Sequence, residues 1–253
     1  MTHASLFTGI GVFDKAAQDI GWELIFQCEI DNFCSNILNQ NFPGVKNLGD
    51  INNAKTKSYN NTIDIISGGF PCQDISISGL GEGIFGKRSG LWSQFARIIE
   101  ETNPKYVVIE NSPQLLKRGF EKVLHDLSEI GYDAEWECLS ASEFGFDHKR
   151  ERLFIIAYPN AQRRRGILHG IKRSRKEANK KETTLDTQCN PFLRFEQRYS
   201  KPAVFGMDDG SATRLDVIKR LGAIGNAVVY DIAYQIFNII NEFEKKEFLI
   251  SKI

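Results

Sequence analysis

Short apolar runs alternate with amphipathic segments along the first 158 residues of the chain. Several of these runs are almost continuous, as is typical of strands that are covered on both faces of a sheet. The predicted strands are Ala4–Phe7, Leu24–Cys28, Ile63–Ser67, Tyr106–Ile109, Ala134–Leu139 and Arg152–Tyr158. The predicted helices between them are Val12–Ile20, Asn32–Gln40, Leu91–Thr102 and Phe120–Ile130. This alternation predicts an α/β fold with a doubly wound, mostly parallel sheet and right-handed crossovers.

The alternation stops after Tyr158, and the next stretch is polar, basic and poor in periodic apolar positions. From Leu215 onward the pattern again indicates helix, and it ends in an amphipathic stretch at Asp231–Phe248. We therefore expect three parts: a core of residues 1–158, a small insertion of residues 159–213, and a helical segment of residues 214–253 that returns to the core.

Charge is distributed unevenly along a chain whose 32 Lys and Arg balance its 32 Asp and Glu. Residues 162–201 hold 12 basic and 4 acidic side chains, so the remainder holds 20 and 28. A basic segment beside an acidic body suits a polyanionic partner. A solvated surface loop explains the charge equally well.

The composition narrows the class of protein. The 18 Phe, 7 Tyr and 3 Trp supply ample core material, which excludes disorder for most of the chain. The longest central apolar run, Leu153–Tyr158, is too short for a membrane span, and the strand-like start at Ala4–Gly11 argues against a signal peptide. The five cysteines form no CxxC pair, so we expect neither a disulfide framework nor a zinc site, and a reducing cytoplasm.

A glycine turn, Phe7-Thr-Gly-Ile-Gly11, joins the first predicted strand to the first helix. Such turns are common, and their glycines let the backbone approach a ligand at a helix N-terminus. Glu29 follows the second strand, where a carboxylate can accept hydrogen bonds from ribose hydroxyls. Asp50 could read an adenine amino group after a third strand, although an isolated aspartate there more often stabilises a turn.

The segment Gly68-Gly-Phe-Pro-Cys72-Gln-Asp directly follows the strand Ile63–Ser67. Catalytic groups of doubly wound sheets lie at the carboxyl ends of strands. Because Pro71 fixes the backbone before Cys72, we expect the thiol in a turn, whereas a lone cysteine usually packs in a core. Five glycines follow within Gly79–Gly90, a segment that could close over a substrate as a lid or be a surface loop without a role.

Three further segments carry candidate chemistry. Glu110 and Asn111 end the strand Tyr106–Ile109, and a carboxyl at the mouth of a buried strand can have a raised pKa and act as an acid. The arginines of His148–Arg152 lead into the last strand, where they can hold an anionic or carbonyl-bearing ligand or lie in solvent. Gly222–Ala227 is a small-residue turn before the final helix.

Taken in this order, the five segments resemble the DNA (cytosine-5) methyltransferase family over everything except about residues 160–210. The strongest matches are Gly69-Phe-Pro-Cys-Gln73, Glu110-Asn111, Arg150-Glu-Arg152 and Gly225-Asn-Ala227. The resemblance implies a Rossmann-like methyltransferase core with a small basic target-recognition insertion. It also implies a pocket for S-adenosylmethionine, and for the product S-adenosylhomocysteine, lined by Phe7, Gly9, Gly11, Glu29, Ile30, Asp50, Ile51, Gly69, Pro71, Leu91, Asn226 and Ala227.

In this family's chemistry Cys72 would be the nucleophile that adds to C6 of a flipped-out cytosine, and C5 would then attack the methyl sulfonium. Glu110 would stabilise the target ring at N3 and the exocyclic amine, and Arg152 would hold the base carbonyl with Arg150 close by. The resemblance implies double-stranded DNA as the partner. The implied DNA-binding residues are Gln73, Ser76, Arg88, Arg163, Arg164, Arg165, Lys172 and Arg173.

Two positions depart from the family pattern: Val12 stands where a further glycine is usual, and His148 where a glutamine is usual. Val12 could tighten the cofactor loop, whereas His148 can still form hydrogen bonds. We expect a monomer, without a membrane segment or a metal, in the cytoplasm of a bacterium or of a phage-infected host. A cognate restriction endonuclease is a candidate partner.

Three alternatives stay open. A relative that methylates transfer RNA would need shape recognition, and comparing DNA with tRNA as methyl acceptors separates the two. A non-catalytic nucleic-acid-binding module has no reason to keep Cys72, Glu110 and Arg152 together. A cysteine hydrolase needs a histidine to pair with the thiol, and no recognisable motif places one.

Overall fold

The computed structural model describes residues 1–71, 89–144, 146, 149–160, 167 and 228–250. The strands are β1 (Thr2–Leu6), β2 (Glu23–Cys28), β3 (Lys46–Asn47), β4 (Ile65–Gly68), β5 (Tyr106–Asn111), β6 (Tyr132–Ser140) and β7 (Glu151–Pro159). The main helices are α1 (Val12–Asp19), α2 (Asn32–Asn41), α3 (Trp92–Thr102), α4 (Phe120–Glu129) and α8 (Tyr230–Ile250). Short 3₁₀ helices are η1 (Lys57–Tyr59), η3 (Ser89–Leu91), η4 (Pro113–Lys117) and η5 (Ala141–Phe144).

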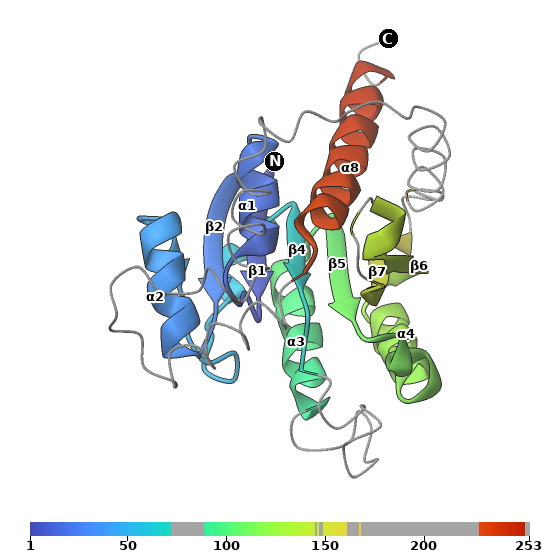
Figure 1. Ribbon diagram of the computed structural model, residues 1–253, viewed down its shortest axis with the longest axis horizontal. Coiled ribbons are helices and arrows are strands. Elements are labelled where there is room, and N and C mark those ends of the chain that lie inside the picture. Colours follow the sequence, from blue (N-terminus) through green and yellow to red (C-terminus); the bar gives the residue numbers. More distant parts are fainter. Residues whose placement is uncertain (72–88, 145, 147–148, 161–166, 168–227, 251–253) are drawn as a thin grey trace.

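The seven strands form one sheet in the order β3-β2-β1-β4-β5-β7-β6 (Figure 1). The first five pair in parallel, whereas β7 runs antiparallel to both β5 and β6. The chain starts in the middle of the sheet, builds outward to β3, and then returns across β1 to build the other half. This is the doubly wound, mostly parallel sheet that the sequence predicts.

Strand β7 shows that a continuous apolar run indicates burial and not strand direction. Its residues Leu153–Tyr158 are all buried, although the strand is the antiparallel one. Helices pack on both faces of the sheet at this point, so every side chain of the run meets apolar neighbours. The run therefore indicates burial on two faces and does not by itself indicate strand direction.

Two apolar layers hold the helices to the sheet. On one face, α3 and α4 pack against the sheet, and α3 presents a stripe of Trp92, Phe95, Ile98 and Ile99 at helical spacing. On the other face lie α1 and α8 (Figure 1). The ring of Phe237 on α8 lies 5.6 Å from that of Phe13.

Helix α8 is tied to the beginning of the chain by polar contacts as well. The hydroxyl of Tyr230 donates a hydrogen bond to Asp19 (2.6 Å), and Trp22 Nε1 donates to Asn241 Oδ1 (3.2 Å). Tyr106 of β5 donates to Glu244 Oε1 (2.9 Å). Residues near the two ends of the chain therefore meet on one face of the sheet.

The predicted strands and helices are confirmed, and their ends shift by no more than two residues. Strand β3 was not among them, because two residues carry no pattern. Apart from Ile167, the basic segment of residues 162–201 lies outside the described residues. Most of Gly79–Gly90 and the chain from Leu215 to residue 227 lie outside them as well. Within the described part of the chain, no helix is both long and apolar enough to cross a membrane.

Candidate active site

The strand register gathers the predicted site residues at one edge of the sheet. Cys28, Leu6, Gly68 and Ile109 align across β2, β1, β4 and β5. The next residue of each strand or following loop therefore lies at the carboxyl edge. These four residues are Glu29, Phe7, Gly69 and Glu110, and ligands of doubly wound sheets bind at this edge.

The glycine turn after β1 has a left-handed backbone at three residues: Phe7 (φ 51°), Gly9 (φ 57°) and Gly11 (φ 85°). A Cβ at Gly11 would lie 2.4 Å from Cε2 of Phe42, so packing also requires glycine there. Phe7 has no such freedom, and its conformation is the kind of strain that clusters at ligand sites. The turn opens directly into α1, with Gly11 as its N-cap.

Glu29 holds this turn. Its Oε2 accepts a hydrogen bond from the backbone N–H of Gly9 (2.7 Å), and its Oε1 accepts one from Asp31 N (2.8 Å). Each carboxylate oxygen can accept more than one hydrogen bond, so the side chain can bind ligand hydroxyls from the same position. The sequence pointed to Glu29 as a ribose ligand and did not anticipate that it would also organise the glycine turn.

The other predicted cofactor residues that follow β2 and β3 differ in what they can offer a ligand. Ile30 is 69% exposed, an uncommon position for an isoleucine and one that suits contact with a flat apolar ring. Asp50 accepts hydrogen bonds from Asn52 N (2.9 Å) and from the side chain of Asn53, which is the turn-stabilising alternative considered above. Ile51 is buried in the core, so its side chain is not available to a ligand.

At the other end of the edge, Glu110 is paired with Arg152 from the neighbouring strand. Arg152 Nε lies 3.0 Å from Glu110 Oε1. Glu110 is only 7% exposed. Burial raises the pKa of Glu110 above its ordinary value, while the charges of Arg152 and Arg150 oppose that rise. A Cβ at Gly69 would lie 2.8 Å from Glu110 Oε2, so Glu110 and the segment before Cys72 are in close contact.

Asn111 is a residue to which sequence reasoning gave no role. It is buried, its amide nitrogen donates to the carbonyl oxygen of Phe70 (3.3 Å), and its Oδ1 accepts from Ser112 N (2.8 Å). Phe70 is further held by the ring of Trp92, whose centroid lies 5.4 Å away. Asn111 therefore fixes the backbone that leads into Pro71. Its place in the motif beside Glu110 was the available signal.

Two other predicted cofactor residues, Phe7 and Leu91, lie against the core. The side chains of Phe7 and Leu91 pack partly buried on the α3 face of the sheet. Val12, one of the departures from the family pattern, is buried in the opposite layer beside Phe13. Its extra side chain is thus absorbed by apolar packing. Pro71 is half-buried at the end of the described segment.

The remaining predicted site residues lie outside the described residues. They include the proposed nucleophile, part of the cofactor set and the whole DNA-binding set. These positions are Cys72, Gln73, Ser76, Arg88, His148, Arg163, Arg164, Arg165, Lys172, Arg173, Asn226 and Ala227. Their placement stays a prediction.

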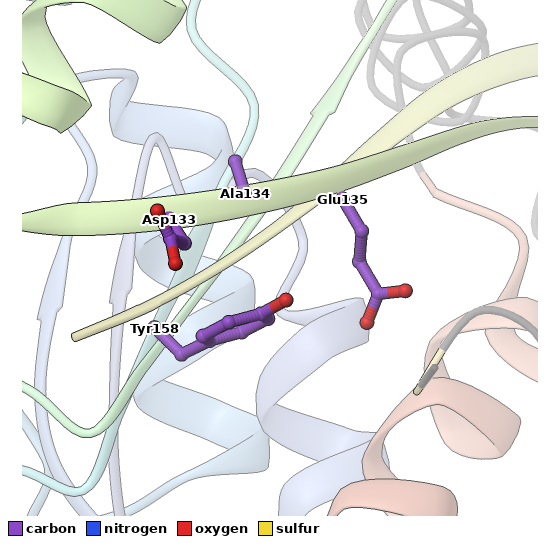
Figure 2. A pocket seen from close by; sticks show the side chains of 4 residues that line it. All are labelled: Asp133, Ala134, Glu135 and Tyr158. Carbon is purple, nitrogen blue, oxygen red and sulfur yellow. The ribbon is translucent and has the colours of Figure 1, made fainter. Parts of the chain in front are cut away.

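A pocket lined by residues of the paired strands β6 and β7 is a separate feature (Figure 2). It is lined by Asp133, Ala134, Glu135 and Tyr158. Ala157 of β7 pairs with Val107 near the start of β5, whereas Leu153 pairs with Asn111 at its end. The pocket therefore lies toward the amino edge of β5, away from Glu110 and Glu29.

The sheet order, its single antiparallel strand and a glycine turn at the carboxyl edge define a Rossmann-like class of α/β protein. Within this class the comparisons identify the family. The family model of C-5 cytosine-specific DNA methylases matches residues 1–204, and the chain belongs to this family.

Similar proteins agree with this assignment. The chain is 35% identical over 165 residues to Type II methyltransferase M2.BsuMI of Bacillus subtilis, a match that covers 62% of this chain and 42% of the relative. It is 34% identical over 159 residues to Type II methyltransferase M.HhaI of Haemophilus parahaemolyticus, covering 61% and 48%. The match thus spans just under half the length of each relative. Methyltransferase EhMeth of Entamoeba histolytica shares the fold, with a TM-score of 0.55 at 20% identity over 62% of this chain and 52% of that one.

Proposed function

We propose that the protein transfers a methyl group from S-adenosylmethionine to C5 of cytosine in a specific double-stranded DNA sequence. The observation that carries this proposal is the buried Glu110–Arg152 pair, which lies against Gly69 in the segment leading to Cys72. Family membership supports the same reaction class.

The residues at the β2 end of the carboxyl edge fit an adenosine-containing cofactor. Glu29 offers carboxylate oxygens to ribose hydroxyls, exposed Ile30 offers an apolar surface to a base, and the glycine turn places no side chain at Gly9. When bound, S-adenosylmethionine supplies an electrophilic methyl group on a sulfonium. Asn226 and Ala227 complete the proposed pocket.

The proposed chemistry begins with the thiolate of Cys72, which forms a bond to C6 of the cytosine. The electron pair of the C5–C6 double bond moves to form a C4–C5 double bond, and that of the C4–N3 double bond moves to N3, which takes up a proton. Glu110 in its protonated form donates to N3, and burial favours that form. Arg152 can donate to the base carbonyl while it remains paired with Glu110. The electron-rich C5 then forms a bond to the methyl carbon while the bond from that carbon to the sulfonium sulfur breaks, which leaves S-adenosylhomocysteine. N3 returns its proton to Glu110, a base removes the C5 proton, and the thiolate leaves as the C5–C6 double bond reforms.

This chemistry requires the cytosine to leave the duplex stack, at a cost of about a few kcal/mol. We propose that residues 159–213 read the target sequence and that the basic side chains of residues 162–201 contact phosphates and base edges. The protein would act as a monomer in the cytoplasm of a bacterium or a phage-infected host. A restriction endonuclease of the same specificity would be its partner in a restriction-modification system.

The proposal is tested by expressing the protein in a host that lacks cytosine methylation and mapping 5-methylcytosine across the genome. We expect 5-methylcytosine within one short sequence motif and none with Cys72→Ala. Transfer RNA from the same cells is the second acceptor to examine. Modification of tRNA with unmodified DNA would overturn the assignment of the substrate.

The recognition region has its own test. Each phosphate contact contributes about −0.9 to the slope of log affinity against log salt. Replacing Arg163, Arg164 and Arg165 together by glutamine should flatten this slope if they meet phosphates, and relax sequence choice if they meet base edges. A triple variant that binds and methylates DNA like the wild type at every salt concentration would remove these residues from the interface.

A further inference from the structure

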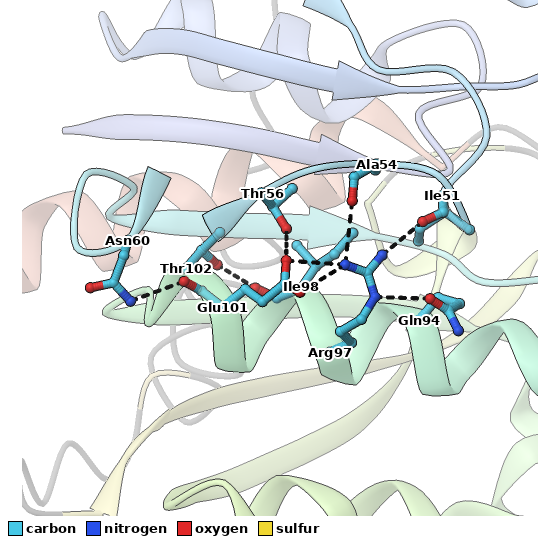
Figure 3. A network of polar contacts seen from close by, with 9 residues as sticks. All are labelled: Ile51, Ala54, Thr56, Asn60, Gln94, Arg97, Ile98, Glu101 and Thr102. Carbon is cyan, nitrogen blue, oxygen red and sulfur yellow. Dashed lines mark hydrogen bonds and ion pairs between the residues drawn. The ribbon is translucent and has the colours of Figure 1, made fainter. Parts of the chain in front are cut away.

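Helix α3 carries a polar cluster that faces the loop after β3 (Figure 3). Arg97 Nη2 donates a hydrogen bond to the carbonyl oxygen of Ile51 (2.8 Å), and Nη1 donates to that of Ala54 (3.3 Å). Both carbonyls belong to the chain that directly follows Asp50. One guanidinium therefore binds two peptide groups of this loop.

Arg97 is itself oriented by its own helix. Its Nε donates to Gln94 Oε1 (2.9 Å), and its Nη1 lies 3.0 Å from both carboxylate oxygens of Glu101. A planar guanidinium presents its donors in fixed directions. The hydrogen bond from Nε to Gln94 therefore also sets the directions in which Nη1 and Nη2 donate. The two carbonyl contacts thus come from a side chain that is already positioned.

Glu101 extends the same cluster to the far end of the loop. Its Oε2 accepts a hydrogen bond from the hydroxyl of Thr56, which is fully buried, and its backbone carbonyl accepts from Asn60 Nδ2 (2.9 Å). Burial acts to raise the pKa of Glu101, but the hydrogen bond from Thr56 and the charge of Arg97 lower it below its ordinary value. Arg97 and Glu101 together hold residues 51–56 from the α3 side.

The start of the loop is held from the β2 side. Asn47 Oδ1 accepts hydrogen bonds from both Glu29 N (3.0 Å) and Gly49 N (3.0 Å), and the thiol of Cys28 contacts Gly49 O (3.1 Å). Asp50 follows Gly49, between this anchor and the carbonyls bound by Arg97. The backbone on both sides of Asp50 is therefore held by contacts.

We infer that Arg97 is a positioning residue for the adenine side of the cofactor site, acting through the loop that carries Asp50. This inference rests on the proposed function and takes Asp50 as the adenine ligand that the sequence predicts, alongside Glu29. The turn contacts of Asp50 with Asn52 and Asn53 leave its two carboxylate oxygens able to accept a further hydrogen bond. Arg97 touches the peptide groups of Ile51 and Ala54 and is not assigned a contact with the cofactor.

The chain offers a matched control. Lys122 and Asp126 form another i,i+4 ion pair, on α4, with Nζ 2.9 Å from Oδ2. Lys122→Met removes an ion pair of the same spacing, and among the described residues Lys122 donates hydrogen bonds only to Asp126. Arg97→Met removes the carbonyl contacts as well, and Arg97→Lys keeps the charge while losing the fork that reaches two carbonyls.

We expect Arg97→Met to weaken S-adenosylmethionine binding about tenfold, since hydrogen bonds to a charged group are lost. Arg97→Lys should recover only part of this loss, and Lys122→Met should bind like the wild type. Calorimetry gives the affinities, and thermal unfolding identifies any variant that is not folded. In the methylation assay the KM for S-adenosylmethionine should rise much more than kcat falls.

A ligand without the adenine amino group distinguishes a loss of the position of Asp50 from a general loosening of the cofactor site. Wild type should prefer S-adenosylhomocysteine to S-inosylhomocysteine, and Asp50→Asn should narrow that preference. Arg97→Met should narrow it as Asp50→Asn does, while Lys122→Met keeps it. If Glu29→Gln loses cofactor affinity but both Arg97 variants bind and discriminate like the wild type, the inference is overturned and the proposed function stands. If the wild type does not bind S-adenosylmethionine, the proposed function itself fails.

Discussion

The two ends of the carboxyl edge hold their acidic residues in different ways. At the β2 end, Glu29 is half-buried and its oxygens accept hydrogen bonds from the backbone of Gly9 and Asp31. At the β5 end, Glu110 is buried, is paired with Arg152, and has a raised pKa. The first arrangement suits hydrogen bonding to a neutral ligand, and the second suits proton donation.

This difference implies that cofactor binding and chemistry can be separated by mutation. Changes at the β2 end should alter affinity for S-adenosylmethionine and leave the rate at saturation nearly intact. Changes at the β5 end should alter the rate and leave cofactor affinity unchanged. A change that affects both quantities equally would mean that the two ends form one unit.

The largest effect is expected for Glu110→Gln. The amide keeps the shape of the side chain but cannot donate a proton to N3, so kcat should fall about 10²–10⁴-fold. Binding of S-adenosylmethionine should stay within about twofold of wild type, because Glu110 lies at the other end of the edge. Single-turnover methylation and calorimetry measure the two quantities. A matching loss in both would remove the distinction between the ends.

Gly69→Ala should have the next largest effect. The added Cβ would lie 2.8 Å from Glu110 Oε2 and 3.1 Å from Glu110 O, so the carboxyl group or the segment before Cys72 must shift. A misplacement of about 1 Å can cost about a hundredfold in rate. Gly90→Ala is the matched control, because a Cβ there meets no atom of the described residues within 4 Å. Equal rates for the two alanine variants would show that the contact at Gly69 is unimportant.

Glu29→Gln should weaken S-adenosylmethionine binding by about one to two decades, because a charge-assisted hydrogen bond is worth about 1.5–3 kcal/mol. The change also weakens the contact with Gly9 N that holds the glycine turn. The rate at saturating cofactor should change little. An unaltered dissociation constant in calorimetry would contradict the placement of the cofactor at this end.

Asp14→Asn tests a buried carboxyl that, unlike Glu110, has neutral partners. Ser5 and Gln27 each donate to Asp14 Oδ1 at 3.1 Å, and burial raises its pKa to about 6. The folded state therefore binds the proton of Asp14 more tightly than the unfolded state does. The stability that this protonated carboxyl contributes is lost as the pH rises from about 4 to 6. Relative to wild type, Asp14→Asn should gain up to about 3 kcal/mol in free energy of unfolding between pH 4 and pH 7.

Urea unfolding at several pH values measures this gain, and Asp64→Asn is its control. Burial acts to raise the pKa of Asp64, but hydrogen bonds from Lys105 and from the backbone of Thr2 lower it below its ordinary value. The stability contributed by Asp64 is therefore lost only as the pH falls below about 4. The difference in free energy of unfolding between Asp64→Asn and the wild type should stay constant from pH 5 to 7. A flat difference for Asp14→Asn as well would disprove the raised pKa.

The sequence predicts the sheet and most helices because these elements arise from local periodicity. Each predicted strand carries its own apolar run, and β7 shows that such a run is readable whatever the direction of the strand. The two-residue β3 has no periodicity to detect. Its existence depends on pairing with β2, a contact that forms only in the folded sheet.

The residues of the candidate site likewise fall into those that a local pattern predicts and those that depend on contacts formed only in the folded protein. Glu29 and Glu110 were predictable because each stands directly after or at the end of an apolar strand. Arg97 was not, because its partners Ile51 and Ala54 lie more than 40 residues earlier in the chain. Ile51 was assigned to the cofactor pocket, but its side chain belongs to the core, since position in a motif does not reveal which way a side chain points.

Covalent trapping tests the central claim, that Cys72 attacks a cytosine while Glu110 assists, most directly. A duplex carries 5-fluorocytosine at the target position found by genome mapping, because fluorine cannot leave as a proton and the adduct persists. Mass spectrometry after incubation with S-adenosylmethionine should find one DNA strand bound to Cys72 in the wild type, a slower adduct with Glu110→Gln, and none with Cys72→Ala. An adduct that forms equally well with Cys72→Ala, or that maps to another residue, would contradict the account.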